Sequence, residues 1–131
     1  PLAEVISWKC AVSQVSDLKP GDSVDYGTTF IAERPMKYAT LPVGYADGLS
    51  RALSGGKGAV YIAGQRCSIL GRVCMDMCMV DVTGLEVHPG DEVEILGPHQ
   101  SASGLAKAAG TISYEVLTGI GPRVPRLYIK D

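Results

Sequence analysis

The sequence has neither a large excess of charge of one sign nor a long hydrophobic run. Its 131 residues include 12 Lys and Arg against 14 Asp and Glu, for a formal net charge of −2 at pH 7. A basic stripe of the kind that binds nucleic acid or anionic membranes is lacking. No apolar run approaches the ~20 residues that cross a bilayer, and no signal segment opens the chain. We expect a cytoplasmic protein that binds neither nucleic acid nor membrane.

Histidine is scarce, which limits the catalytic arrangements that the sequence can form. The only two histidines are His88 and His99, which lie in turns rich in proline and glycine. Neither lies near a serine or cysteine in a matched setting, so a hydrolytic triad is disfavoured. The glycine-rich residues 54–58 lack the spacing and the following helix of a phosphate-binding loop. Hydrolases of the triad type and dinucleotide-binding proteins are therefore poor interpretations.

Cysteines are few, and they lack the pairing of a structural metal site. The four are Cys10, Cys67, Cys74 and Cys78. An even number allows two disulfides, but these residues lie in apolar runs, where cysteine acts as a small buried hydrophobe. Structural zinc needs four ligands at paired spacings, and the chain offers a single pair with no matching histidines. We expect reduced thiols and no metal.

Turn-forming residues, in contrast, are abundant. The chain has 16 Gly and 8 Pro, scattered between short apolar runs. This pattern favours many turns and short strands over long helices. Helix signal is confined to residues 101–110, with Ser101 or Ser103 as N-cap, and one further turn of helix is expected at residues 111–117 with Thr111 as its cap. We expect strands at residues 5–12, 23–26, 37–43, 59–62, 66–70, 73–82 and 93–96. One mainly-β domain covering residues 1–131, most simply a closed barrel, accounts for this pattern.

A weak internal repeat supports that interpretation. Residues 20–24 (PGDSV) are echoed by residues 89–93 (PGDEV), and each copy is followed by a strand-like stretch and then glycine. Two turn-then-strand units of one design fit a barrel or sandwich built from similar pieces. A match this short and simple, four identical residues in five, can also arise by chance.

The apolar run at residues 73–80 contains a carboxylate. In a strand, Met75, Met77 and Met79 would share one face and Asp76 would lie on the other. A carboxylate in such apolar surroundings must find a partner or become neutral. Asp76 is therefore either a member of a structural ion pair or part of a site, and composition does not choose between these.

Five ordered motifs carry a resemblance to a known family. They are residues 24–30 (VDYGTTF), 41–48 (LPVGYADG), 71–77 (GRVCMDM), 110–115 (GTISYE) and 122–126 (PRVPR). The sequence resembles the C-terminal domain of alanine racemase over essentially its whole length. That family comprises pyridoxal-phosphate enzymes of bacterial D-alanine supply, which provide a precursor of cell-wall peptidoglycan.

The resemblance implies a closed Greek-key β-barrel that follows a larger (β/α)-barrel domain. The larger domain would carry the lysine that binds pyridoxal 5′-phosphate as a Schiff base, and none of the six lysines of this chain matches a cofactor-lysine motif. The chain starts at Pro1 without an initiator Met, as expected of a fragment or a processed product. We therefore expect the N-terminal domain to be absent here and the isolated chain to be inactive. Its expected partners are that domain, a second subunit of a homodimer and a small amino-acid substrate.

The resemblance also implies residue roles. Tyr26 matches the base that acts on the L-side of the substrate, projecting into the active site of the partner subunit. Met75 matches the residue whose backbone N–H holds the substrate carboxylate, and Tyr114 matches a hydroxyl that contacts the cofactor phosphate. The residues that match the narrow corridor through which substrate enters are Tyr45, Arg51, Arg72, Ile112 and Asp76.

Two alternatives stand beside alanine racemisation. One is the equivalent domain of a serine or broad-specificity racemase, because a single hydroxyl would be recognised mainly by walls of the preceding domain. The other is a barrel used only for interaction, which the joint presence of Tyr26, Met75 and Tyr114 disfavours. Three departures from the family pattern touch none of the matched chemical groups: Asp25 for Ser, Ser113 for Asn, and Gly104, which weakens the short helix.

Overall fold

The computed structural model describes residues 7–24, 30–121 and 124. The described strands are β1 (Trp8–Ala11), β2 (Gln14–Leu18), β3 (Met36–Leu41), β4 (Ala59–Ile62), β5 (Gln65–Leu70), β6 (Cys78–Asp81) and β7 (Glu92–Leu96). Two 3₁₀ helices, η1 (Tyr45–Asp47) and η2 (Arg51–Leu53), and two α-helices, α1 (Ala102–Ala109) and α2 (Ser113–Gly119), accompany them. No helix in this part of the chain is long and apolar enough to cross a membrane.

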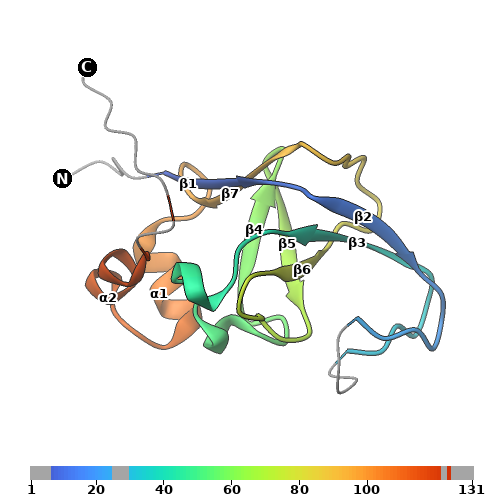
Figure 1. Ribbon diagram of the computed structural model, residues 1–131, viewed down its shortest axis with the longest axis horizontal. Coiled ribbons are helices and arrows are strands. Elements are labelled where there is room, and N and C mark those ends of the chain that lie inside the picture. Colours follow the sequence, from blue (N-terminus) through green and yellow to red (C-terminus); the bar gives the residue numbers. More distant parts are fainter. Residues whose placement is uncertain (1–6, 25–29, 122–123, 125–131) are drawn as a thin grey trace.

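The strands form one curled antiparallel sheet, in the order β1-β7-β4-β5-β6-β3-β2 (Figure 1). The two ends of this order, β1 and β2, are consecutive in the chain. Between them, Val12 N–H donates to Asp91 O and Ser13 N–H donates to Thr40 O, each at 2.9 Å. The chain thus passes within two residues from the β7 side to the β3 side. The mainly-β class is confirmed, and closure into a Greek-key barrel stays a prediction.

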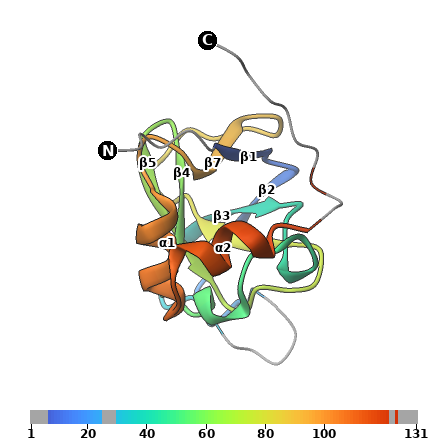
Figure 2. The ribbon, with the colours of Figure 1, turned by 90° about the vertical axis from the view of Figure 1, so that its left-hand side faces the viewer.

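The main core fills the inside of the curl, and the helices cover one end of it (Figure 2). Strand positions such as Leu41, Val60 and Val80 are almost completely buried, as expected where alternate side chains point inward. Ser101 caps α1 as predicted, since its Oγ accepts from Gly104 N–H at 3.0 Å. The predicted cap Thr111 is wrong, because α2 begins one residue later and its N-cap, Ile112, makes no side-chain cap bond.

The strand expected at residues 73–82 is largely wrong. Only Cys78–Asp81 is strand, and residues 74–77 form a turn in which Cys74 N–H donates to Met77 O at 2.9 Å. Met75 and Met77 are therefore exposed on the turn whereas Met79 is buried in the sheet. The turn replaces the strand because the carbonyls of residues 74 and 75 are taken up by another loop instead of a neighbouring strand.

The weak sequence repeat is a repeat of structure. In the 19–22 turn and in the 88–91 turn the glycine has φ of +93°, a region that favours glycine. The final aspartate accepts the N–H of the first residue through Oδ2, at 2.8 Å in the first turn and 2.9 Å in the second. Each glycine N–H donates at 2.7 Å to a facing carbonyl, that of Ala32 or Val12. The two copies thus fold alike: the 88–91 turn bonds to Val12, just before β2, and the 19–22 turn directly follows β2.

The strand predicted at residues 23–26 has a described part and an undescribed part. Ser23 forms an isolated antiparallel bridge with Ile31. Asp25 and Tyr26 lie outside the described residues. A second, smaller core lies beneath this pairing, built on Leu18, Ala32, Met36 and Leu70.

Candidate functional site

Three segments meet at one end of the sheet: residues 44–48, the 72–77 turn, and the end of α2. Tyr45 N–H donates to Cys74 O and Ala46 N–H donates to Met75 O, each at 3.0 Å. A Cβ on Gly44 would clash with the carbonyls of residues 74 and 75, so glycine alone allows this approach. The 72–77 turn is thereby fixed against the start of η1.

The third segment, the end of α2 with the residues that follow it, also contacts residues 44–48. The buried Asp47 accepts from Gly44 N–H through Oδ2 at 3.1 Å, and its carbonyl accepts from Gly121 N–H at 2.9 Å. Gly48, with φ of +107°, lies so close to Gly119 that a Cβ would clash with the Gly119 carbonyl. Residues 44–48 are therefore wedged between the turn and the end of α2.

η2 brings a guanidinium to the same place. Ser50 caps η2 by accepting from Ala52 N–H at 3.1 Å. The Arg51 Cζ then lies 5.3 Å from the centroid of the Tyr45 ring, within the range of a cation–π contact. Ser54 Oγ accepts from Val73 N–H at 2.8 Å, which joins η2 to the turn beside Arg72. The two 3₁₀ helices thus bring Tyr45 and Arg51 together, and the end of η2 is bonded to the turn that begins at Arg72.

Met75, at the tip of the turn, presents an available donor. Its carbonyl is used by Ala46, whereas its N–H donates to no acceptor among the described residues. Its side chain is exposed, as are those of Asp76 and Met77. The apolar surroundings inferred for Asp76 are therefore wrong, because the carboxylate lies on an exposed turn. A backbone N–H that has no acceptor among the described residues and lies on a fixed turn suits the binding of an anion.

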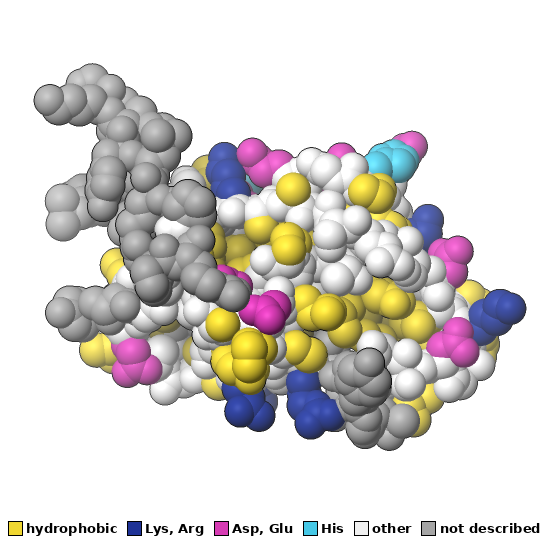
Figure 3. All heavy atoms as spheres, in the orientation of Figure 1, with side chains coloured by type: hydrophobic (Ala, Val, Ile, Leu, Met, Phe, Trp, Pro, Cys, Tyr) yellow, Lys and Arg dark blue, Asp and Glu magenta, His cyan; other side chains and the backbone are white. Residues whose placement is uncertain are grey.

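We call the exposed residues that these elements present the site face: Tyr45, Arg51, Arg72, Met75 and Ile112. Large hydrophobic side chains are exposed here, including Ile112 at 66% and Met75 at 53%. Figure 3 shows hydrophobic side chains beside Lys or Arg side chains along the lower edge of the molecule. An exposed apolar patch with guanidinium groups is typical of a surface that meets another protein or a ligand.

A cavity of about 190 Å³ lies between the 3₁₀ helices and the α-helices, next to the site face. Thr111, the neighbour of Ile112, is among the residues that line it. The lining residues are Gly48, Ser50, Leu53, Leu105, Ala109, Thr111, Glu115, Val116 and Gly119. Because η2 and the start of α2 both line this cavity, Ile112 lies at the same end of the molecule as η2.

The thiols take no part in this chemistry. Burial raises the pKa of Cys10 and of Cys78 to about 12, and that of Cys67 to about 11. These three thiols therefore stay protonated at neutral pH, which makes them poor nucleophiles. All four cysteines are free, and the described residues contain no group of three or more His, Cys, Asp or Glu placed to hold a metal.

The side chains of two residues predicted for the site are not among those that the structure describes. Tyr26 is outside the described residues, and Tyr114 lies on α2 with its side chain outside the described set. Supporting residues that the sequence did not indicate are Gly44, Asp47 and Ser54. The sequence signal for Gly44 and Asp47 was the pair of glycines, Gly44 and Gly48, on either side of the aspartate. Both glycines serve close backbone approach.

Comparison with known proteins decides the family. Residues 5–128 match the family model described as "Alanine racemase, C-terminal domain". This chain belongs to that family. It is 46% identical to the alanine racemase of Halothermothrix orenii, over 97% of this chain and 35% of that protein. Against the Clostridium perfringens alanine racemase the identity is 48%, over 99% of this chain and 35% of the relative.

Solved alanine racemases share the fold. The alanine racemase of Bartonella henselae, crystallised with covalently bound pyridoxal phosphate, superposes with a TM-score of 0.90 at 39% identity, covering 94% of this chain and 34% of that one. The Bacillus anthracis alanine racemase with bound L-Ala-P gives a TM-score of 0.88 at 35% identity, covering 95% and 33%. The chain thus spans about a third of the length of the alanine racemases it matches.

Proposed function

We propose that this chain is the C-terminal domain of a bacterial racemase that interconverts L- and D-alanine. In this proposal it forms one wall of the active site, a preceding domain forms the rest, and two such subunits make a homodimer. The observation that carries the proposal is the site face, where the Met75 N–H, which donates to no acceptor among the described residues, lies on a turn bonded to η1 and to the end of η2, and η1 and η2 carry Tyr45 and Arg51. Membership of the family supports the same reaction.

The lysines of this chain do not fit the role of binding pyridoxal phosphate. Of the described lysines, Lys9 lies in an ion pair with Glu92 at 3.3 Å, and Lys19, Lys37, Lys57 and Lys107 are exposed or partly exposed. None is buried beside the cavity described above. The cofactor, whose ring withdraws electrons from the substrate and so acidifies its α C–H, therefore belongs to the preceding domain.

The residues of the site face bind and orient the substrate in this proposal. The Met75 N–H donates to the substrate carboxylate, and a hydrogen bond to a charged group contributes ~1.5–3 kcal/mol. Arg51 and Arg72 line the corridor and attract the same carboxylate, and the Tyr45 ring limits the motion of Arg51. Ile112 and Tyr45 narrow the corridor and exclude water. We assign Asp76 to the corridor and the Tyr114 hydroxyl to the cofactor phosphate.

Racemisation needs a proton acceptor on each face of the reacting carbon, because a proton removed from one face is returned to the other. We propose Tyr26 as the base for the L-substrate, acting in the active site of the partner subunit. A phenol has a free pKa near 10, so its activation has to come from groups of the other domain. The absence of a histidine or cysteine on the site face, within the described residues, supports this division of labour.

We also propose that the curled sheet closes as a Greek-key barrel and that the enzyme works in the bacterial cytoplasm, supplying D-alanine to peptidoglycan precursors. The consecutive positions of β1 and β2 at the two ends of the strand order support closure. A net charge of −2 is compatible with a cytoplasmic location.

Replacing Tyr26 by Phe in the complete enzyme tests the proposed function. The substitution removes only the hydroxyl, so the expected result is an asymmetric loss. Exchange of the α-hydrogen of L-alanine in deuterated water falls by at least ~10²–10⁴-fold, whereas exchange of the α-hydrogen of D-alanine persists. Wild-type exchange of both enantiomers in the variant would show that Tyr26 is not the base. Equal loss of both would assign it to cofactor positioning.

A further inference from the structure

The start of the 72–77 turn is bonded to the residues that end η2. Gly55 N–H donates to Gly71 O at 2.8 Å, and Val73 N–H donates to Ser54 Oγ, also at 2.8 Å. Val73 is almost completely buried, so its N–H needs a partner within the protein. The Ser54 hydroxyl therefore satisfies a donor that water reaches poorly and joins the turn to η2.

The middle of the turn is bonded to η1. Tyr45 N–H donates to Cys74 O and Ala46 N–H donates to Met75 O, each at 3.0 Å. The Met75 N–H, which donates to no acceptor among the described residues, thus follows the bonded N–H of residue 73 and lies between two bonded carbonyls. Its direction is therefore set jointly by the bonds to η1 and the bond to η2.

The bonds to η1 use backbone groups on both sides, whereas the bond to Val73 uses a side chain. Ser54 ends η2 in an extended conformation, with φ of −62° and ψ of 158°, and its own N–H donates to Arg51 O at 3.1 Å. The backbone of Ser54 is thus held by η2 independently of its hydroxyl. A substitution can remove the hydroxyl and leave the backbone bonds of this residue in place.

We propose that Ser54 is a positioning residue for substrate binding: by accepting from Val73 N–H, it holds the 72–77 turn so that the Met75 N–H meets the substrate carboxylate. The inference rests on the proposed function and deepens it. Racemisation changes bonds at the α-carbon, and the carboxylate keeps its charge throughout. A hydrogen bond to the carboxylate is therefore about as strong in the bound substrate as in the transition state, and weakening it raises KM without lowering kcat.

Thr83 provides a matched control in the same sheet. Its Oγ1 accepts from Lys37 N–H at 3.0 Å, so here too a hydroxyl receives the N–H of a distant segment. The β3–β6 pair has Leu41 opposite Cys78 at one end, next to the 72–77 turn. Lys37 and Thr83 adjoin its other end. The control therefore removes the same kind of bond away from that turn.

The test compares Ser54→Ala with Thr83→Val in the complete enzyme, since each substitution removes one hydroxyl acceptor. Ser54→Ala should raise the KM of L-alanine and of D-alanine by ~10-fold with kcat unchanged, because a hydrogen bond to a charged group is weakened. Thr83→Val should leave both constants at their wild-type values, although thermal unfolding should show a similar loss of stability in the two variants. Ser54→Thr, which keeps the hydroxyl, should restore the KM.

The outcomes separate the two proposals. If the complete wild-type enzyme does not interconvert L- and D-alanine, the proposed function fails, and this inference fails with it. If the wild type racemises alanine but Ser54→Ala keeps the wild-type KM, lowers kcat alone or behaves like Thr83→Val, only the positioning role is overturned. Should Ser54→Ala not fold, Ser54→Cys replaces it, and the same rise in KM is expected because a thiol is a weak acceptor.

Discussion

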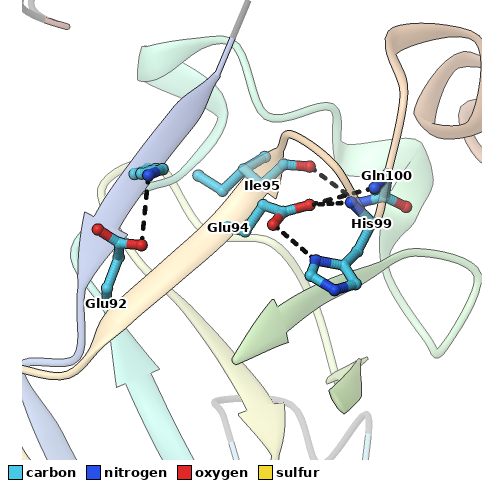
Figure 4. A network of polar contacts seen from close by, with 6 residues as sticks. Glu92, Glu94, Ile95, His99 and Gln100 are labelled. Carbon is cyan, nitrogen blue, oxygen red and sulfur yellow. Dashed lines mark hydrogen bonds and ion pairs between the residues drawn. The ribbon is translucent and has the colours of Figure 1, made fainter. Parts of the chain in front are cut away.

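Glu94 of β7 keeps only 12% of its side chain exposed, yet each of its carboxylate oxygens has a donor (Figure 4). Oε2 accepts from His99 N–H at 2.7 Å and from Gln100 N–H at 3.2 Å, and Oε1 lies 2.9 Å from His99 Nδ1. The Tyr61 ring stacks on the His99 ring at 5.6 Å between centroids. A single carboxylate thus holds the bend that leads from β7 into α1.

The other half of this bend is held by Gln100. Its Nε2 donates to Ala59 O at 2.8 Å and to Ile95 O at 2.9 Å, so it joins β4 to β7. Because α1 follows directly and contacts α2, the position of the helices beside the site face depends on this network.

We predict that acid weakens the fold through Glu94. Burial alone would raise its pKa, but the His99 ring and the N–H groups of His99 and Gln100 lower it below the ordinary 4.5. A lowered pKa contributes stability above the unfolded value, and this contribution is lost as pH falls through the folded pKa. Urea unfolding of the wild type and of Glu94→Gln from pH 7 to pH 3 measures it.

The variant should be ~1–3 kcal/mol less stable at neutral pH, and the difference should shrink below about pH 4.5. The groups that face the carboxylate across the sheet, Lys9 on β1 and Tyr61 on β4, remain in both proteins. A difference that stays constant over the whole range would contradict the assignment.

At the scale of elements, the wedge formed by residues 44–48 sets the geometry of the site. We predict that Gly48→Ala loosens it, because the added Cβ would clash with the Gly119 carbonyl where η1 meets α2. Gly55→Ala is the control, since Gly55 also has positive φ, +71°, but an added Cβ there meets no atom within 4 Å. Both variants place alanine at positive φ, and overpacking adds ~1–3 kcal/mol at Gly48 alone. Equal urea midpoints for the two variants would show that the wedge is not tight.

The elements that could be predicted from sequence are those with a clear hydrophobic period. β4 and β7 follow runs bounded by glycine or proline, and Ser101 with its alanine-rich segment indicates α1. β2 was not predicted because few side chains of Gln14–Leu18 are buried, so the segment shows little hydrophobic pattern. The strand at residues 73–77 was predicted wrongly because Met75 and Met77 are apolar yet exposed, which breaks the assumption that apolar residues face the core.

The residues of the site face were equally hard to predict from hydrophobic periodicity. Tyr45, Arg51 and Met75 could be named only through the family motifs, because each is an ordinary surface residue until the fold brings it beside the others. Their approach depends on backbone contacts of Gly44 and Gly48, and such contacts leave no periodic pattern in a sequence. η1 and η2 are likewise too short to show a period.

At the scale of the whole molecule, the chain has a core of its own but spans only about a third of the length of the alanine racemases it matches. We predict that the isolated 131-residue chain folds yet neither binds pyridoxal phosphate tightly nor racemises alanine. Folding is expected because one main core fills the curled sheet, and inactivity is expected because the described lysines lie away from the cavity. Far-ultraviolet circular dichroism and titration with the cofactor check both points. A cofactor absorbance band that borohydride removes would contradict the prediction.

The consecutive strands β1 and β2 have a consequence for the order in which the chain folds. β2 finds its partner β3 nearby in sequence, but Trp8 of β1 pairs with Leu96 of β7, the last described strand. Contacts of such long separation form late, because a large loop must close first. During synthesis β1 is thus made early and waits, with its hydrogen-bonding edge unpaired, until β7 leaves the ribosome. The last strand of the sheet to be paired is the first to be translated.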